Sequence, residues 1–165
     1  MLKEETNKGI VLGIGNTGRQ DDGLGWLFLD HLKNKGFKEY DLEYRYQLQI
    51  EDAELISRYQ NVLFVDASKE EIEEGFYTKT CLPSEKYSFS THELMPETIL
   101  FLAKTLYNAE PDAKILGIKG YQWNLKNGIC KKAEENLKKA TDFFLKSETV
   151  YSIKVSENTL IIDLH

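Results

Sequence analysis

The order of short apolar stretches and amphipathic stretches along the chain predicts an α/β protein with a largely parallel sheet. Strand-like stretches alternate with helix-like stretches, which is the pattern of βαβ units. The crossovers in such units place helices on both faces of the sheet. The length of 165 residues is typical of one domain, and the 41% hydrophobic and 29% charged residues are typical of a globular protein. We therefore expect a single domain over residues 1–165.

Three predicted strands and two predicted helices make up the N-terminal half. Residues 9–14, GIVLGI, form a short apolar run, as in a strand buried on both faces. Residues 23–36 carry apolar side chains at helical spacing and close on a glycine, which commonly ends a helix. Alternation and tyrosine enrichment predict a strand over 42–48, and a short helix follows over 51–59. The strongly apolar residues 61–67 predict a third strand.

Two further strands and two further helices are predicted in the C-terminal half. In chain order they are a strand over 75–82, a helix over 93–107, a strand over 113–120 and a helix over 129–146. Pro96 is compatible with the first of these helices, because a proline in the first turn removes no helical hydrogen bond. Residues 149–165 give mixed signals, and we expect them to form a poorly ordered tail.

Charge and composition argue against several classes of partner. The chain has 21 Lys and Arg against 27 Asp and Glu, a formal net charge of -6 that disfavours non-specific binding to nucleic acid or an anionic membrane. No apolar run approaches the ~20 residues of a membrane span, and the N-terminus lacks the apolar core of a signal peptide. Cys81 and Cys130 form no CxxC pair, so no redox motif is indicated. We expect a cytoplasmic monomer.

Polar side chains follow the strands of this predicted sheet. Asp21 and Asp22 come after the first strand, Asp66 ends the third, His92 precedes a helix and Lys119 ends the last strand. Ligands of open α/β sheets bind at the carboxyl ends of the strands. We therefore expect these groups along one edge of the sheet.

One interpretation of this edge is a dinucleotide site. Residues 13–25, GIGNTGRQDDGLG, contain the pattern Gly-x-Gly-x-x-Gly, whose backbone can approach a pyrophosphate at a helix N-terminus. However, Asp21 and Asp22 stand where the phosphates would lie, and like charges repel. The acids about twenty residues further on, Asp41 and Glu43, begin the second strand instead of ending it.

A second interpretation is a receiver-like phospho-acceptor domain. Such a domain uses an acidic pair after the first strand, an aspartate after the third and a lysine after a later strand, and Asp66 and Lys119 fit the last two positions. Here the acidic pair lies several residues beyond the strand. The stretch after Asp66, ASKEEIEEG, also lacks the usual proline turn.

A third interpretation is a metal site formed by Asp22, Asp66 and His92. Two carboxylates and one imidazole suit divalent Zn, Ni, Mn or Fe. Three protein ligands also leave coordination positions open for a substrate, as catalytic metal sites require.

Several segments of the chain match, in order, the motifs of one known family. VLGIGNTGRQDDGLG has an apolar strand, Gly-x-Gly-Asn, a short loop, an acidic pair and Gly-x-Gly. The matching residues are Gly13, Gly15, Asn16, Asp21, Asp22, Gly23 and Gly25. Further matches are QLQIE (47–51), VLFVDA (62–67), STHE (90–93) and ILGIKG (115–120). In these motifs the chain resembles the hydrogenase maturation endopeptidases.

The resemblance implies a three-layer α/β/α sandwich around a mixed, mostly parallel sheet. It implies an endopeptidase that removes a C-terminal extension from the large-subunit precursor of a nickel–iron hydrogenase after nickel insertion. The nickel would arrive with the precursor, and no organic cofactor is implied. A catalytically inactive maturation chaperone that binds nickel or the precursor remains an alternative.

Carried over to this chain, the resemblance assigns Asp22, Asp66 and His92 as nickel contacts and as catalytic residues. No Ser-His-Asp or Cys-His arrangement has a family-like context. We therefore expect hydrolysis by water, with either carboxylate as the general base.

The remaining polar and glycine residues of the first loop are expected to support it. Gly13, Gly15 and Gly23 would let the backbone turn sharply and pack closely. We expect Asn16 to bond to loop backbone. We expect Asp21 to point away from Asp22 and to cap the first helix.

Overall fold

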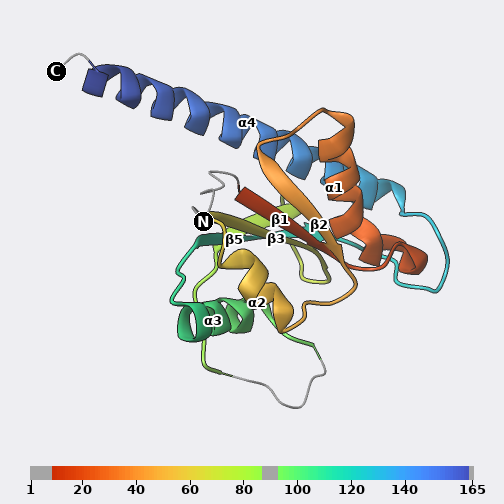
Figure 1. The fold of residues 1–165 in the computed structure, drawn as a ribbon. Coiled ribbons are helices and arrows are strands. Elements are labelled where there is room, and N and C mark those ends of the chain that lie inside the picture. The colour runs from red at the N-terminus through yellow and green to blue at the C-terminus, as the bar shows by residue number, and fades with distance from the viewer. Residues whose placement is uncertain (1–8, 87–92, 164–165) are drawn as a thin grey trace.

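Five strands form one mixed sheet in the computed structural model, which describes residues 9–86 and 93–163, with side chains as far as residue 149 (Figure 1). The strands are β1 (Gly9–Ile14), β2 (Tyr40–Arg45), β3 (Asn61–Ser68), β4 (Phe76–Thr80) and β5 (Asp112–Lys119). Their order across the sheet is β2-β1-β3-β5-β4. The first four strands in this order are parallel, and β4 pairs with β5 as an antiparallel edge strand.

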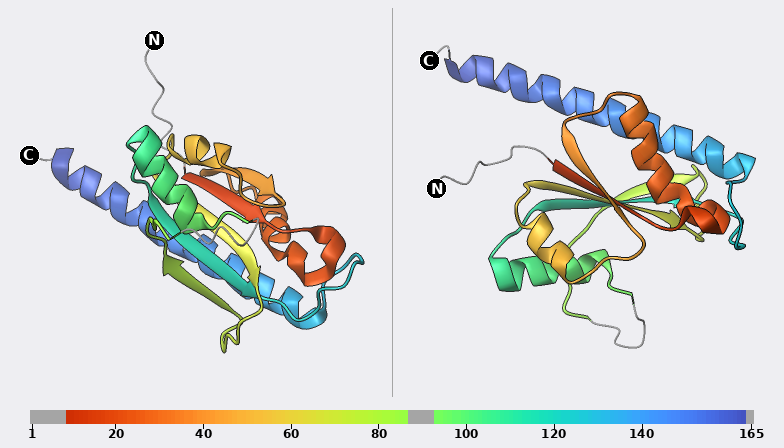
Figure 2. Two further views of the ribbon diagram at one scale, coloured as in Figure 1. Left: turned by 90° about the horizontal axis from the view of Figure 1, so that it is seen from below. Right: turned by 45° about the vertical axis from the view of Figure 1, so that its right-hand side comes forward.

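Helices cover both faces of the sheet, so the protein has three layers (Figure 2). The helices are a short 3-10 helix η1 (Thr17–Gly23), α1 (Leu24–Asn34), α2 (Glu51–Ile56), α3 (Pro96–Tyr107) and α4 (Lys131–Asp163). Side chains alternate along a strand, so Ile10 and Leu12 of β1 pack in the core under α2 and α3. Val11 between them packs in the second core, under α1 and α4. The predicted fold class, an α/β sandwich with a mixed and mostly parallel sheet, is confirmed.

The second strand lies closer to the N-terminus than predicted. β2 spans Tyr40–Arg45 instead of 42–48. Arg45 pairs with Ile14, the last residue of β1, so the residues after Arg45 have no β1 backbone left to pair with. As a result, Tyr46 and Gln47 leave the sheet and turn toward the end of β1, where the candidate site lies.

The last helix is longer than predicted. The sequence predicts a helix over 129–146 and a poorly ordered tail over 149–165, whereas α4 runs from Lys131 to Asp163 and extends past the sheet (Figure 1). Residues 131–163 contain no glycine or proline, so no residue of this stretch breaks a helix by its own backbone chemistry. Among the described residues, no helix combines the length and the apolarity needed to cross a membrane.

Candidate active site

A cavity of about 160 Å³ opens at the carboxyl ends of β1 and β3. This is the edge at which ligands bind in open α/β sheets. Asp22 and Asp66, two of the three predicted ligands, both line the cavity. The described lining contains acids and no lysine or arginine: Ile14, Gly15, Asp22, Tyr46, Gln47, Leu48, Asp66, Glu93, Leu94, Met95 and Pro96.

The loop after β1 brings Asp22 to the cavity through close backbone packing. Gly15 has φ +146°, and a Cβ atom there would lie 2.0 Å from the carbonyl oxygen of Asp22. Gly13 is equally constrained, because a Cβ atom there would lie 2.5 Å from the carbonyl oxygen of Gly25 in α1. Only glycine allows the strand, the loop and the helix to approach this closely. Gly23, the third predicted supporting glycine, immediately precedes α1.

Asn16 holds the start of the same loop. Its side-chain Oδ1 accepts a hydrogen bond from the backbone N–H of Gly18 at 2.8 Å, which caps η1. Its own backbone N–H donates to the carbonyl oxygen of Asp22 at 3.2 Å. The side chain of Asn16 thus bonds to loop backbone, as its position in the sequence led us to expect.

Asp22 is half-buried at the cavity. Burial raises the pKa of Asp22, and the negative charge of Glu93 adds to this effect. The positive charge of Arg19 and a hydrogen bond from the Asn16 backbone act in the opposite direction. The carboxylate form of Asp22 is therefore destabilised overall in the protein without a bound cation.

The pKa of Asp66 is raised more strongly than that of Asp22. Burial raises the pKa of Asp66 to about 7. A hydrogen bond from the backbone N–H of Ala67 to Oδ1, 2.8 Å long, opposes the rise, whereas the negative charges of Asp22 and Glu93 increase it. A carboxyl group with this pKa changes its protonation state near neutral pH, which is the property that a general base in hydrolysis needs.

The charge of the cavity favours a cation over a phosphate. The two aspartates each face burial and like charge, and a divalent cation would relieve both. Lys119, which the receiver-like interpretation places near Asp66, points elsewhere. Its Nζ donates to the carbonyl oxygen of Lys69 at 2.9 Å and pairs with Glu71 at 3.5 Å. The charge of the cavity therefore favours a cation over a nucleotide or a phosphoryl group.

The third predicted ligand, His92, lies outside the described residues, so its assignment remains a prediction. Within residues 9–86 and 93–149, no group of three His, Cys, Asp or Glu side chains is arranged to hold a metal ion. Glu93, next to His92 in the sequence, lines the cavity and raises the pKa of both aspartates. Sequence reasoning missed Glu93, although it stands in the same THE motif as the predicted histidine.

The prediction that Asp21 caps the first helix is wrong. α1 begins after Gly23 without a side-chain cap. The carboxylate of Asp21 is buried and accepts hydrogen bonds from the backbone N–H groups of Tyr121, Gln122 and Cys130, at 2.7, 2.9 and 2.9 Å. The Cys130 thiol donates a fourth, with Sγ 3.2 Å from Oδ2. Burial raises the pKa of Asp21, but these hydrogen bonds outweigh it and lower the pKa overall.

Gln20 completes the attachment of the site loop to the loop that follows β5. Gln20 has φ 51°, a conformation that is uncommon for a residue other than glycine. Its backbone N–H donates to the carbonyl oxygen of Lys126 at 3.0 Å, and its Oε1 accepts from the backbone of Asn124 at 2.9 Å. Together, Gln20 and Asp21 fix the position of Asp22 by contacts about one hundred residues away in sequence.

Solved structures of hydrogenase maturation proteases have this fold. HycI from Thermococcus kodakarensis KOD1 is 22% identical, with a TM-score of 0.67 over 85% of this chain and 91% of that protein. HybD from E. coli is 16% identical, with a TM-score of 0.63 over 85% and 91% of the two chains. The hydrogenase 2 maturation peptidase from a Thaumarchaeota archaeon is 19% identical, with a TM-score of 0.62 over 86% and 98%.

The comparisons with solved structures establish the fold of this chain. No protein-family model matches the sequence, and no curated protein matches it. The chain nevertheless has the α/β fold of the hydrogenase maturation proteases over most of its length. Because one fold can serve several functions, the function must be argued from the site.

Proposed function

We propose that this chain is an endopeptidase that removes a C-terminal extension from the nickel-loaded large-subunit precursor of a nickel–iron hydrogenase. The observation that carries the proposal is the pairing of Asp22 and Asp66 in one acidic cavity at the strand ends of this fold. The solved structures that share this fold include several named as hydrogenase maturation proteases and peptidases.

Nickel enters this proposal as part of the substrate. Asp22 and Asp66, with His92 as the third contact, would bind the ion that the precursor carries. The two carboxylates attract a divalent cation because burial and mutual repulsion leave each of them poorly compensated without one. Recognition of the ion would therefore place the precursor at the cavity only after nickel has been inserted.

Hydrolysis would use water as the nucleophile. Asp22, Asp66 and His92 would hold the divalent ion of the precursor, which would supply Lewis-acid polarisation of a carbonyl oxygen. The carboxylate of Asp66 accepts a proton from the attacking water while the oxygen of that water bonds to the scissile carbonyl carbon. The protonated Asp66 then donates the proton to the leaving amine as the carbon–nitrogen bond breaks.

The test is a cleavage assay with purified protein. Nickel-loaded precursor and metal-free precursor from the same source are incubated with the chain, and their masses are measured. We expect loss of the C-terminal extension only from the nickel-loaded form. We also expect no loss with Asp22→Asn or Asp66→Asn, and normal cleavage with Asp112→Asn, an exposed aspartate at the opposite end of the sheet. Binding of the precursor without any cleavage would instead assign the chain as a maturation chaperone.

A further inference from the structure

A second hollow, of about 420 Å³, adjoins the candidate active site. It is lined by Trp26, Tyr44, Arg45, Tyr46, Gln47 and Gln49. Tyr46 and Gln47 also line the acidic cavity, so the two hollows share one wall. We refer to the surface formed by Trp26, Tyr44, Tyr46, Gln47 and Gln49 as the aromatic ledge. The aromatic ledge is continuous with the acidic cavity.

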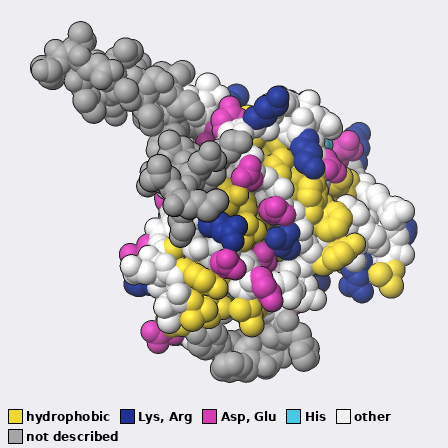
Figure 3. All heavy atoms as spheres, viewed as in Figure 1, with side chains coloured by type: hydrophobic (Ala, Val, Ile, Leu, Met, Phe, Trp, Pro, Cys, Tyr) yellow, Lys and Arg dark blue, Asp and Glu magenta, His cyan; other side chains and the backbone are white. Residues whose placement is uncertain are grey.

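Trp26 and Tyr44 are half-buried and use their polar ends within the protein, whereas Tyr46 is exposed. The Trp26 ring lies 5.4 Å from that of Tyr44, edge-on, and 5.0 Å from that of Tyr46. The Trp26 Nε1–H donates to the carbonyl oxygen of Arg45 at 2.9 Å, and the Tyr44 hydroxyl donates to Asp30 at 2.6 Å. Tyr46 is nevertheless 67% exposed. Hydrophobic side chains gather on the side of the molecule that carries β2 and the start of α1 (Figure 3).

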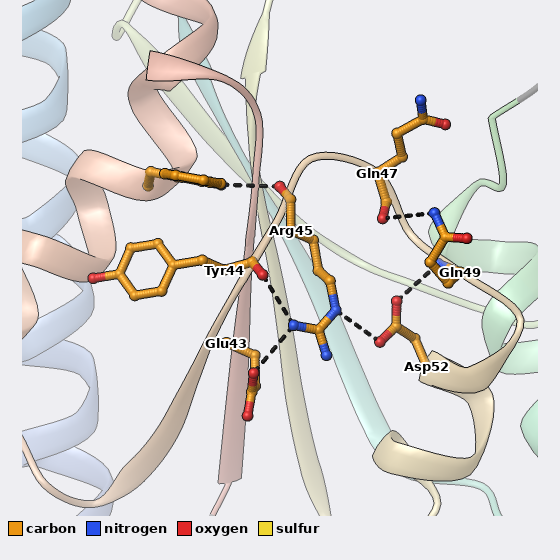
Figure 4. A network of polar contacts seen from close by, with 7 residues as sticks. Glu43, Tyr44, Arg45, Gln47, Gln49 and Asp52 are labelled. Carbon is orange, nitrogen blue, oxygen red and sulfur yellow. Dashed lines mark hydrogen bonds and ion pairs between the residues drawn. The ribbon is translucent and has the colours of Figure 1, made fainter. Parts of the chain in front are cut away.

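The backbone beneath the ledge is held in place by Arg45 and Asp52 (Figure 4). The Arg45 guanidinium donates to Glu43 at 3.1 Å, to the Tyr44 carbonyl oxygen at 2.9 Å and to Asp52 at 3.0 Å. The other oxygen of Asp52, which is buried, accepts from the backbone N–H of Gln49 at 2.8 Å. A surface fixed in this way loses little conformational entropy when a ligand binds.

The same backbone connects the ledge to the loop after β1. The carbonyl oxygen of Arg45 accepts a hydrogen bond from Gly15 at 2.9 Å as well as the one from Trp26. Gly15 lines the acidic cavity and packs against the backbone of Asp22. A ligand on the ledge is therefore held at a fixed position relative to the two aspartates.

The polar groups of the ledge suit an uncharged ligand. The positive charge of Arg45 is compensated by Glu43 and Asp52. The side-chain amide of Gln47 forms no hydrogen bond with another described residue and turns away from the Arg45 network (Figure 4). A free amide offers both a donor and an acceptor, which match the backbone groups of an extended peptide.

We propose that the aromatic ledge binds an extended, uncharged and apolar peptide segment of the substrate, adjacent to the bond that is cleaved at Asp22 and Asp66. This inference rests on the proposed function, which defines the substrate. The exposed ring of Tyr46 and the half-buried rings of Trp26 and Tyr44 supply apolar contact area, and the Gln47 amide pairs with the peptide backbone. The ledge would thus select the sequence next to the scissile bond, while the acidic cavity recognises the metal.

The first test is an NMR titration of the uniformly 15N-labelled protein, which needs no precursor. The probe is an uncharged, blocked hexapeptide of alanine, valine, leucine and serine. A second hexapeptide, which carries two glutamates, serves as the charged comparison. We expect the uncharged peptide at millimolar concentration to shift the indole N–H of Trp26 and the side-chain amide of Gln47. The indole of Trp123, which is outside the ledge, provides an internal control. Absence of a Trp26 shift, or an equal Trp123 shift, would overturn the proposal.

The second test distinguishes a failure of the aromatic-ledge proposal from a failure of the proposed function. With nickel-loaded precursor, Tyr46→Ala should raise KM about tenfold, equivalent to ~1.4 kcal/mol of binding energy, with a smaller change in kcat. Tyr107→Ala, an exposed tyrosine at the end of α3, should leave both constants unchanged. Peptide shifts at Trp26 without precursor cleavage would refute the proposed function and retain the ledge. Cleavage with an unchanged KM in Tyr46→Ala, and no peptide shifts, would refute the ledge and retain the function.

Discussion

Replacing Asp66 by asparagine is expected to stabilise the metal-free protein above neutral pH. Asp66 is the cavity residue whose ionisation the fold opposes most, since burial raises its pKa to about 7. Asparagine has nearly the same shape and carries no charge. Its Oδ1 can still accept the 2.8 Å hydrogen bond from Ala67. The substitution therefore removes the cost of a buried charge while it preserves the local contact.

The direction of the effect is set by proton linkage. The pKa of Asp66 rises from 3.8 in the unfolded chain to about 7 in the folded protein. Between these two values the folded state keeps a proton that the unfolded state has released, so stability is greatest below the unfolded pKa and falls as the pH rises toward 7. About three pH units correspond to an upper bound of ~4 kcal/mol. Because Asp66 is partly accessible to water, we expect Asp66→Asn to add about 2 kcal/mol at pH 8.

The assay is equilibrium unfolding in urea from pH 4.5 to 8.5, with chelator present. The difference between Asp66→Asn and wild type should grow across this range and level off above pH 8. Asp112→Asn, at an exposed aspartate, should follow the wild-type profile. The reasoning is refuted if Asp66→Asn is no more stable than wild type at pH 8, or if the two profiles stay parallel.

Three further substitutions test the architecture of the site. Gly15→Ala should cost more than ~2 kcal/mol in urea unfolding, because its Cβ atom would meet the Asp22 carbonyl oxygen. Gly36→Ala, also at positive φ but with no atom within 4 Å, should cost less and serves as the control. Asp21→Ala should cost more than ~3 kcal/mol, since it removes a buried carboxylate that accepts hydrogen bonds from three backbone N–H groups. An unchanged urea midpoint would contradict this role. His92→Ala should change stability by less than ~1 kcal/mol while precursor cleavage falls at least tenfold; retained cleavage with lost stability would remove it from the site.

The convergence of the two cavity aspartates on one edge of the sheet could be predicted because it depends on local signals. The apolar runs ending near residues 14 and 67 predict strands, and parallel strands place the loops at their carboxyl ends along one edge of the sheet. The convergence of Asp22 and Asp66 could therefore be inferred without any knowledge of long-range contacts. A largely parallel sheet with helices on both faces was predictable for the same reason, because the alternation of strands and helices restricts the topology. The mixed character of the sheet was implied by the family resemblance and not by the alternation.

The role of Asp21 could not be predicted because its partners lie far away in sequence. A short acidic side chain before a helix is usually a cap, but here backbone N–H groups of residues 121–130 bind the Asp21 carboxylate instead. The end of β2 has a similar explanation. Alternation in 42–48 continues past Arg45, but strand pairing stops where β1 stops. Both differences come from tertiary contacts that override a local pattern.

The central claim, that the loop after β1 and the end of β3 form a cation site, is tested most directly by anomalous diffraction from crystals soaked in millimolar cadmium chloride. We predict an anomalous peak between the carboxylates of Asp22 and Asp66, within reach of His92, that disappears in crystals of Asp66→Asn. Cadmium bound elsewhere on the protein, with this cavity empty, would contradict the account.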